Sequence, residues 1–249
     1  MKPVYALLAA AFAVLPAGFA GAAETNVAVA ANFTNAAKDI AAAFTEETGD
    51  TVLLSFGSTG KLYAQIANGA PFSVFLAADQ ARAKKAVDEG FAVEGSEFTY
   101  AIGKLVLFSE DADLVDDNGA VLNAPDSFSK LAIANPAAAP YGAAAVETMT
   151  SLNVYDALQP KLVQGDSISQ TFQFVATGNA ELGFVALSQV IGNDSGSQWV
   201  VPAELYEPIR QDGVLTNAGA DDDVAKAFLD FLKGDKATAI IEGYGYAVE

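Results

Sequence analysis

The sequence of 249 residues contains neither histidine nor cysteine. Their absence excludes Ser-His and Cys-His nucleophilic catalysis, imidazole and thiolate metal sites, iron–sulfur clusters and disulfide bonds. Positive charge is also scarce, because 13 Lys and Arg stand against 31 Asp and Glu and give a net charge of −18. Such an acidic surface repels nucleic acid and anionic lipid headgroups. The chemistry left is that of oxygen atoms and backbone amides, so a bound anion would need a local, oriented site.

Long apolar runs are rare, and the clearest one is N-terminal. Lys2 is the only charged residue before Glu24, residues 4–19 are almost wholly apolar, and residues 20–22 have the small-x-small form of a signal-peptidase site. We interpret residues 1–23 as a cleaved signal peptide. An uncleaved membrane anchor is the alternative, but the apolar core is short and is interrupted by a proline and a glycine. The acidity of the remaining chain is typical of a soluble exported protein.

After this segment, short apolar strands alternate with amphipathic helices. We expect strands at residues 26–30, 51–56, 73–77, 101–109, 131–134, 161–163 and 182–187. We expect helices that begin near residues 34, 61, 80, 141, 168 and 224. This alternation favours parallel α/β sheets, in which ligands bind beyond the carboxyl ends of the strands. The length suits one α/β domain or two modest lobes.

The most informative local feature is Gly57-Ser58-Thr59-Gly60, a turn between a predicted strand and a predicted helix. The first backbone N–H groups of a helix have no acceptor within it, and the peptide dipoles place about half a positive charge at that end. Such a turn is therefore typical of an anion site. Hydroxyl side chains also cap helices, but two of them between two glycines exceed what a cap requires.

Two other patterns suggest different chemistry. Residues 58–61 spell the S-x-x-K motif of penicillin-recognising serine enzymes, in which the serine attacks and the lysine assists. The companion K-T-G motif is absent from the sequence. A hydrolase using Ser58 and Lys61 is therefore an alternative that only one of the two motifs supports. Tyr244 and Tyr246 could bind ferric ion as phenolates, although a glycine-linked aromatic pair is more typical of packing.

A more specific pattern is carried by residues 29–36, 55–60, 69–79, 182–186 and 244–246. In this order and spacing, these segments resemble the periplasmic molybdate-binding proteins of ABC importers. The resemblance covers nearly all of the mature chain. It implies a two-lobed α/β periplasmic-binding-protein fold of type II, in which each lobe is a mixed sheet flanked by helices and two crossover strands join the lobes. It places lobe one at residues 24–104 plus 206–249 and lobe two at residues 105–205.

The resemblance also implies an oxyanion held between the lobes by uncharged donors. Asn32 takes the place of a first-loop serine, and its side-chain amide can donate equally well. Thr59 occupies the second-loop hydroxyl position, with Ser58 beside it. Tyr141 and Ile168 fall at helix starts in lobe two. There the family contributes backbone N–H groups and sometimes a tyrosine hydroxyl.

Ala186 is the clearest departure from the family pattern, because some relatives place there a tyrosine that reaches the anion. The resemblance leaves Tyr141 as a candidate to supply that phenol from another direction. Each matched residue also has an ordinary structural interpretation. Asn32 could cap a helix, Tyr141 could be a core aromatic, and Ile168 could be the first core residue of its helix.

The matched residues also narrow the ligand. A tetrahedral dianion that is fully deprotonated at neutral pH presents only acceptors, and the matched positions offer donors. Phosphate carries a proton that a carboxylate could accept, but none of these positions is acidic. A sugar would need stacking aromatics, and Trp199 lies outside the matched segments. An amino acid would need an arginine, and neither Arg82 nor Arg210 lies in one.

We therefore expect a periplasmic, monomeric receptor that is not an enzyme. It would capture molybdate or tungstate in a cleft and deliver the anion to an ABC permease. The resemblance implies no cofactor and no nucleic acid partner, and the metal would be held only as the oxyanion, through the same residues. A receptor of the same fold for sulfate, another oxyanion or ferric ion is the main alternative. The exclusion of sulfate depends on cavity size, which only a structure can show.

Overall fold

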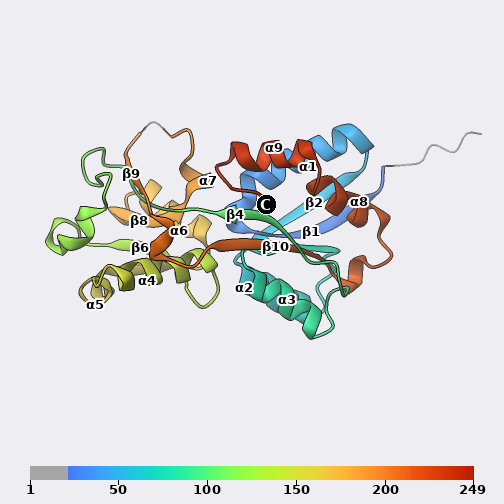
Figure 1. The fold of residues 1–249 in the computed structure, drawn as a ribbon, viewed down its shortest axis with the longest axis horizontal. Coiled ribbons are helices and arrows are strands. Elements are labelled where there is room, and N and C mark those ends of the chain that lie inside the picture. The colour runs from blue at the N-terminus through green and yellow to red at the C-terminus, as the bar shows by residue number, and fades with distance from the viewer. Residues whose placement is uncertain (1–21, 194) are drawn as a thin grey trace, which may run out of the picture.

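The computed structural model describes residues 22–193 and 195–249. The chain forms two halves that lie side by side, each built around its own five-stranded sheet (Figure 1). The expected signal peptide, residues 1–23, falls outside the described residues except for its last two. Within the described part of the chain, no helix combines the length and the apolar character that a bilayer crossing requires.

The first sheet has the strand order β2-β1-β3-β10-β4, and we call the half built on it lobe one. β1 pairs in parallel with β2 and β3, whereas β10 runs antiparallel to β3 and β4. The sheet is therefore mixed, as the resemblance implied, and not wholly parallel as the alternation alone suggested. Its strands are β1 (Glu24–Ala30), β2 (Thr51–Gly57), β3 (Val74–Leu76), β4 (Phe98–Gly103) and β10 (Ile209–Leu215).

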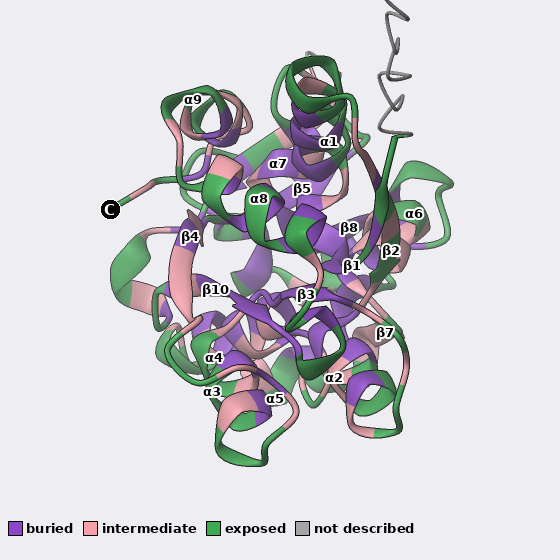
Figure 2. Ribbon diagram, turned by 90° about the vertical axis from the view of Figure 1, so that its right-hand side faces the viewer, coloured by how far each residue is buried: buried purple, intermediate pink, exposed green. Residues whose placement is uncertain are grey.

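Helices cover both faces of this sheet. The larger apolar cluster joins one face to α1, α8 and α9, and a smaller one joins the other face to α2 and α3. In Figure 2 the buried residues gather in the strands and on the inner sides of these helices. The helices are α1 (Thr34–Thr48), α2 (Thr59–Ala67), α3 (Gln80–Asp88), α8 (Asp223–Leu232) and α9 (Asp235–Gly243).

The second sheet has the order β7-β6-β8-β5-β9 and forms lobe two. α4 and α5 pack on one face, and α6 and α7 pack on the other. Its strands are β5 (Leu105–Ser109), β6 (Leu131–Ala134), β7 (Leu162–Gly165), β8 (Leu182–Ala186) and β9 (Ser197–Val200). Its helices are α4 (Pro140–Ser151), α5 (Tyr155–Leu158), α6 (Ile168–Ala176) and α7 (Leu187–Val190). The 3₁₀ helices of the chain are η1 (Ala31–Phe33), η2 (Ala120–Asn123), η3 (Pro125–Ser127), η4 (Gln159–Lys161), η5 (Ala203–Leu205) and η6 (Asn217–Gly219).

The prediction of a single long strand at residues 101–109 is wrong. β4 ends at Gly103 in the first sheet and β5 begins at Leu105 in the second, so the chain changes lobe at Lys104. The sequence shows no break because the residues on both sides of Lys104 are buried and apolar. The chain returns between β9 and β10. We propose lobe one at residues 24–104 plus 206–249 and lobe two at residues 105–205.

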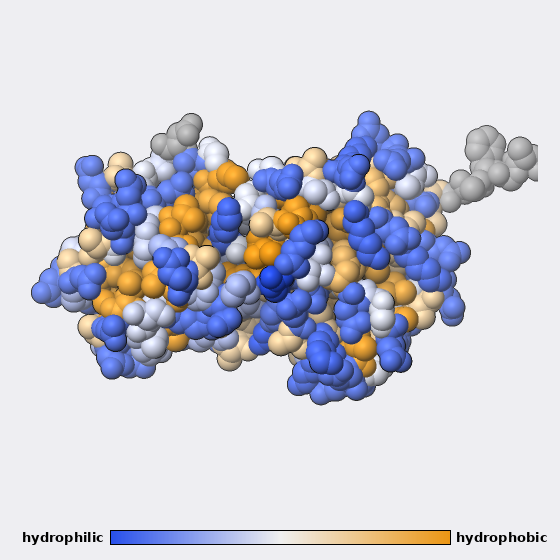
Figure 3. Space-filling model, viewed as in Figure 1, coloured by the Kyte–Doolittle hydropathy of each residue, from blue (hydrophilic) through white to orange (hydrophobic). Residues whose placement is uncertain are grey.

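α1 illustrates how local sequence sets the elements. Ala36, Ile40 and Phe44 recur at helical spacing and are almost fully buried, so one stripe of the helix packs on the sheet. Burial of an aromatic side chain such as Phe44 contributes about 1.5–3 kcal/mol. The helix ends at Gly49, whose φ of 82° is a left-handed conformation that glycine adopts without strain. On the outside, hydrophilic residues cover most of the face shown in Figure 3, with smaller apolar areas between them.

Candidate functional site

The five residues expected at the site line one small cavity between the lobes. Lobe one contributes Asn32, Ser58 and Thr59, and lobe two contributes Tyr141 and Ile168. The cavity is small, with a volume of about 10 Å³, far below the range of about 300–1,000 Å³ that drug-sized ligands need. The remaining lining residues are all alanine or proline, so no charged side chain lines this cavity: Ala30, Ala31, Ala78, Ala139 and Pro140.

Three helix N-termini converge on the cavity. Thr59 is the first residue of α2, Ile168 is the first residue of α6, and Tyr141 is the second residue of α4. Backbone N–H groups at these positions have no acceptor within their helices, and each helix adds partial positive charge there. Pro140 suits the first position of α4, since its ring fixes φ and it has no N–H to satisfy. The cavity is therefore surrounded by uncharged donors from both lobes.

Within the described part of the chain, the Ser58 hydroxyl is buried next to the cavity without a hydrogen-bond partner. Its side chain is buried, with 3% of the residue exposed, and Oγ has no hydrogen-bond partner among the described residues. A buried polar group without a partner costs about 1–3 kcal/mol, so such groups are rare in folded proteins. Because this hydroxyl belongs to a residue that lines the cavity, a bound acceptor is the simplest partner for it.

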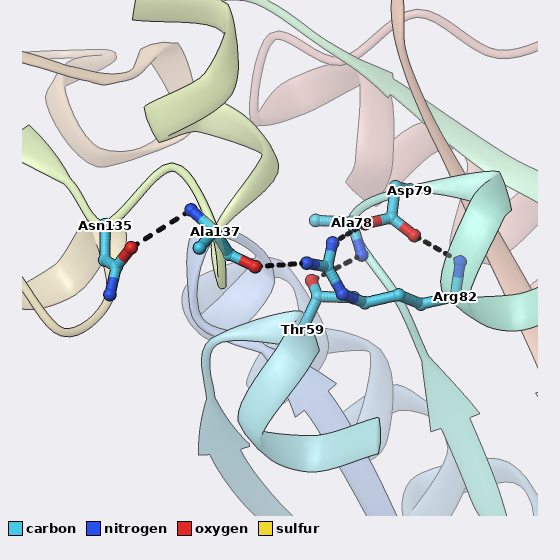
Figure 4. Close-up of polar contacts among 6 residues, drawn as sticks. All are labelled: Thr59, Ala78, Asp79, Arg82, Asn135 and Ala137. Carbon is cyan, nitrogen blue, oxygen red and sulfur yellow. Dashed lines mark hydrogen bonds and ion pairs between the residues drawn. The ribbon is translucent and has the colours of Figure 1, made fainter. Parts of the chain in front are cut away.

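The neighbouring hydroxyl of Thr59 has a different role. Thr59 Oγ1 accepts a hydrogen bond from the backbone N–H of Ala78 at 3.1 Å, as Figure 4 shows. This contact ties the start of α2 to the segment that follows β3. The Thr59 hydroxyl still has its own proton to donate. The sequence pattern centred on Thr59, but the hydroxyl that lacks a partner is that of Ser58.

The expectation that the Asn32 side chain donates to an anion needs correction. Its Nδ2 donates to Gln211 Oε1 at 2.8 Å and to the Tyr246 hydroxyl at 3.1 Å, which uses both amide hydrogens. The donor that remains to Asn32 is its backbone N–H. This group lies in the first turn of the helical segment that begins at Ala31, where it has no acceptor within that segment.

The phenol of Tyr141 also lies elsewhere than expected. Its hydroxyl is 3.5 Å from Gln211 Nε2 and lies so close to Gly103 that a Cβ atom there would overlap it. The phenol therefore reaches the crossover strands, and burial raises its pKa well above the ordinary value. Ala186 is fully buried opposite Leu105 in the second sheet and does not line the cavity. Tyr141 therefore contributes its backbone at the N-terminus of α4 to the cavity, and not its phenol.

Direct contacts hold the two lobes together around the cavity. Gly60 N–H donates to the Ala138 carbonyl at 2.9 Å. Arg82 Nη2 donates to the Ala137 carbonyl at 2.6 Å, as Figure 4 shows. Arg82 is oriented by Asp79, whose carboxylate accepts from Nη1 at 2.5 Å. All five residues lie on the loops that precede α3 and α4 or on the first turns of α2 and α3. The lobes are therefore closed on each other at this edge of the cavity.

Charged side chains stand next to the cavity but outside it. Arg82 and Arg210 line a neighbouring interlobe cavity with a volume of about 300 Å³. Both are neutralised there, Arg82 by Asp79 and Arg210 by Glu249. The small cavity thus keeps an all-neutral lining although two guanidinium groups are nearby.

The other two patterns do not form sites of their own. Lys61 Nζ lies 2.7 Å from Asp166 in a largely exposed ion pair that bridges the lobes. The Tyr244 hydroxyl donates to Asp39 at 2.6 Å near the surface, whereas the Tyr246 hydroxyl is buried against Asn32. The two phenols therefore have separate partners. In residues 22–193 and 195–249, no group of three or more Asp and Glu side chains is arranged to hold a metal ion.

The comparisons with known proteins agree with this geometry. Residues 25–247 match the family model described as bacterial extracellular solute-binding protein. The chain is 60% identical over 230 residues to the molybdate-binding protein ModA of Rhodobacter capsulatus, covering 92% of this chain and 90% of that one. It is 57% identical over 233 residues to ModA of Azotobacter vinelandii, covering 92% of each.

Solved structures show the same relationship. The periplasmic molybdate-binding protein of Azotobacter vinelandii superposes with a TM-score of 0.87 at 43% identity, covering 90% of this chain and 99% of that one. The sulfate-binding protein of Mycobacterium tuberculosis has a TM-score of 0.75 at 11% identity and covers 90% of this chain and 86% of that one, a likeness of fold alone. The two-lobed α/β fold is confirmed, and the chain belongs to the family of bacterial extracellular solute-binding proteins.

Proposed function

We propose that this protein is a periplasmic receptor that binds molybdate or tungstate in the small interlobe cavity and delivers the anion to an ABC permease. The observation that carries the proposal is the buried Ser58 hydroxyl without a partner, in a cavity that no charged side chain lines. The names of the relatives in Rhodobacter capsulatus and Azotobacter vinelandii give the ligand class.

The chemistry of the lining supports a fully deprotonated oxyanion. Such an anion needs donors on every side, and three helix N-termini plus the Ser58 hydroxyl supply them. A protonated phosphate would also need an acceptor for its proton, and no carboxylate lines the cavity. A cavity of about 10 Å³ leaves no room for a sugar or a peptide.

We propose that the anion is held by Ser58 Oγ and by backbone N–H groups of Asn32, Thr59, Tyr141 and Ile168. Three of these residues belong to lobe one and two to lobe two. A ligand that contacts both lobes binds only the closed arrangement and therefore shifts the population toward it. Closure is the signal by which a permease could distinguish the loaded receptor from the empty one.

A serine–lysine hydrolase is not favoured. The Lys61 ammonium is paired with Asp166 at 2.7 Å, which is the wrong partner for a lysine that must assist Ser58. The relatives in Rhodobacter capsulatus and Azotobacter vinelandii are named as binding proteins and not as enzymes. Binding without covalent chemistry is the function that the cavity supports.

Competition calorimetry on the mature chain tests the proposal directly. Molybdate and tungstate should bind, and sulfate and phosphate in excess should not displace them. Ser58→Ala should weaken molybdate binding about ten- to a hundredfold, because a hydrogen bond to a charged group contributes about 1.5–3 kcal/mol. Ser127→Ala, which changes an exposed serine of lobe two, is the matched control and should bind as the unmodified protein does. Equal affinity for molybdate and phosphate would refute the proposal, as would full affinity in Ser58→Ala.

A further inference from the structure

A network of buried, uncharged side chains lies behind the cavity, with Gln211 at its centre. Gln211 belongs to β10 and is fully buried. Its Oε1 accepts from Asn32 Nδ2 at 2.8 Å and from the Tyr100 hydroxyl at 3.2 Å. Its Nε2 donates toward the Tyr141 hydroxyl at 3.5 Å. One side chain therefore contacts a cavity residue from each lobe.

The backbone around Gln211 is shaped for this contact. The pairing of β10 with β4 shifts register between Gln211 and Asp212, and such bulges re-aim side chains next to binding sites. Gly103, at the end of β4, leaves the space that the Tyr141 hydroxyl and Gln211 Nε2 fill, since a Cβ atom there would collide with both. The two strands next to the crossovers, β4 before the first and β10 after the second, thus accommodate the network.

The C-terminal tail supplies a second link to the same cavity residue. The Tyr246 hydroxyl donates to the Asn32 carbonyl at 2.8 Å and lies 2.9 Å from Ser188 Oγ of lobe two. Ser188 Oγ donates to the same carbonyl at 2.9 Å. The tail is held in place by a pair of hydrogen bonds between Ile102 and Ala247. The peptide and the side chain of Asn32 are therefore fixed from both lobes.

We propose that Gln211 is a positioning residue that couples lobe closure to the shape of the oxyanion cavity. It touches no ligand; it holds the Asn32 amide in lobe one and the Tyr141 phenol in lobe two, and so orients the two backbone donors that these residues present to the cavity. This inference rests on the proposed function, because it assigns Gln211 a role in binding that function's ligand.

Two substitutions separate positioning from mere stability. Gln211→Met preserves the volume but removes all three side-chain hydrogen bonds, and molybdate affinity should fall about tenfold or more. Gln211→Glu preserves the shape and the acceptor. When the new carboxylate is ionised, it places a negative charge directly behind the cavity residues that contact the bound anion. The affinity of Gln211→Glu for molybdate should therefore fall with rising pH. When protonated at lower pH, it should recover most of the affinity.

The surroundings of residue 211 allow this pH profile to be interpreted. The phenols of Tyr100 and Tyr141 contact residue 211, and that of Tyr246 shares the Asn32 amide with it. Burial raises the pKa of each phenol, that of Tyr246 to about 12. These phenols stay neutral between pH 6 and pH 9. The carboxylate of Asp212 is turned to Thr99, which donates to it at 2.7 Å, and to Gln80. A new pH dependence in that range would therefore report residue 211.

Calorimetric titration with sodium molybdate at pH 6 and pH 9 decides the question, with Gln65→Glu, an exposed position on α2, as the control of equal charge. We expect the unmodified protein and Gln65→Glu to bind equally at both pH values, and Gln211→Glu to lose at least fivefold between them. If the two controls bind molybdate and Gln211→Glu shows a flat profile at their affinity, the inference is overturned while the proposed function stands. If the controls bind no molybdate, the proposed function itself fails. A melting curve checks folding, and the comparison within Gln211→Glu decides even if Gln211→Met does not fold.

Discussion

Arg82 links the two lobes, and its removal should open the closed form without changing how the anion is captured. The guanidinium is held by Asp79 in lobe one and donates to the Ala137 carbonyl of lobe two at 2.6 Å. Arg82→Met preserves most of the aliphatic stem. It also spares the cap of α3, because Asp79 accepts from the backbone N–H of residue 82 and not only from the side chain. The substitution therefore removes the interlobe contact and the ion pair with Asp79 but keeps the cap of α3.

The size of the effect follows from this one contact. A hydrogen bond from a charged group contributes roughly 1.5–3 kcal/mol, and solvent screening reduces that value for a partly exposed group. A quarter of the Arg82 side chain is exposed, so we take about 1.5 kcal/mol, which corresponds to a little more than tenfold. Because the contact forms only when the lobes close, the dissociation rate of molybdate should rise by that factor and the association rate should change little.

Stopped-flow displacement of bound molybdate by excess tungstate measures the dissociation rate, and calorimetry measures the affinity. Lys84→Met is the matched control, since Lys84 lies on the same helix and pairs with Asp88 of its own lobe at 2.8 Å. That control should behave as the unmodified protein does. An unchanged dissociation rate in Arg82→Met, or a loss confined to the association rate, would refute the idea that this arginine stabilises the closed form.

Two further predictions concern stability. A ligand that binds only the native state adds about 2.7 kcal/mol at a hundredfold excess over Kd, which is about 5–10 °C in Tm for a chain of this size. A thermal melt should show this shift with molybdate and not with equimolar sulfate, and equal shifts would contradict the proposed selectivity. Burial would raise the pKa of Asp222, but hydrogen bonds from the Thr25 hydroxyl and from the backbone N–H of Ala225 at the start of α8 outweigh it and lower the pKa. A lowered pKa contributes stability that is present above the ordinary value and is lost as pH falls through the folded-state pKa. In urea titrations, Asp222→Ala should thus be about 1 kcal/mol less stable at pH 7, with a smaller difference near pH 2, and an equal difference at both pH values would contradict this linkage.

Local sequence determined the elements that carry the site. Ser58 and Thr59 between two glycines, Pro140 before Tyr141, and Ser167 before Ile168 are capping and turn signals that act over a few residues, and each marks the start of a helix in the structure. The expected strand at residues 131–134 also agrees with β6. The order of the matched segments implied the two lobes. Such features were predictable because backbone dihedrals, caps and turns depend on immediate neighbours.

Tertiary structure alone decided which atoms face the cavity. The Asn32 amide turns to Gln211, 179 positions away, and nothing in the local pattern of β10 marks that glutamine as a partner. The Ala78 N–H donates to the Thr59 hydroxyl, whereas the buried Ser58 hydroxyl has no partner among the described residues. The split of the expected long strand at Lys104 has the same origin. Apolar character and hydroxyl content are properties of single residues, whereas hydrogen-bond partners over such distances are set by how the lobes pack and close.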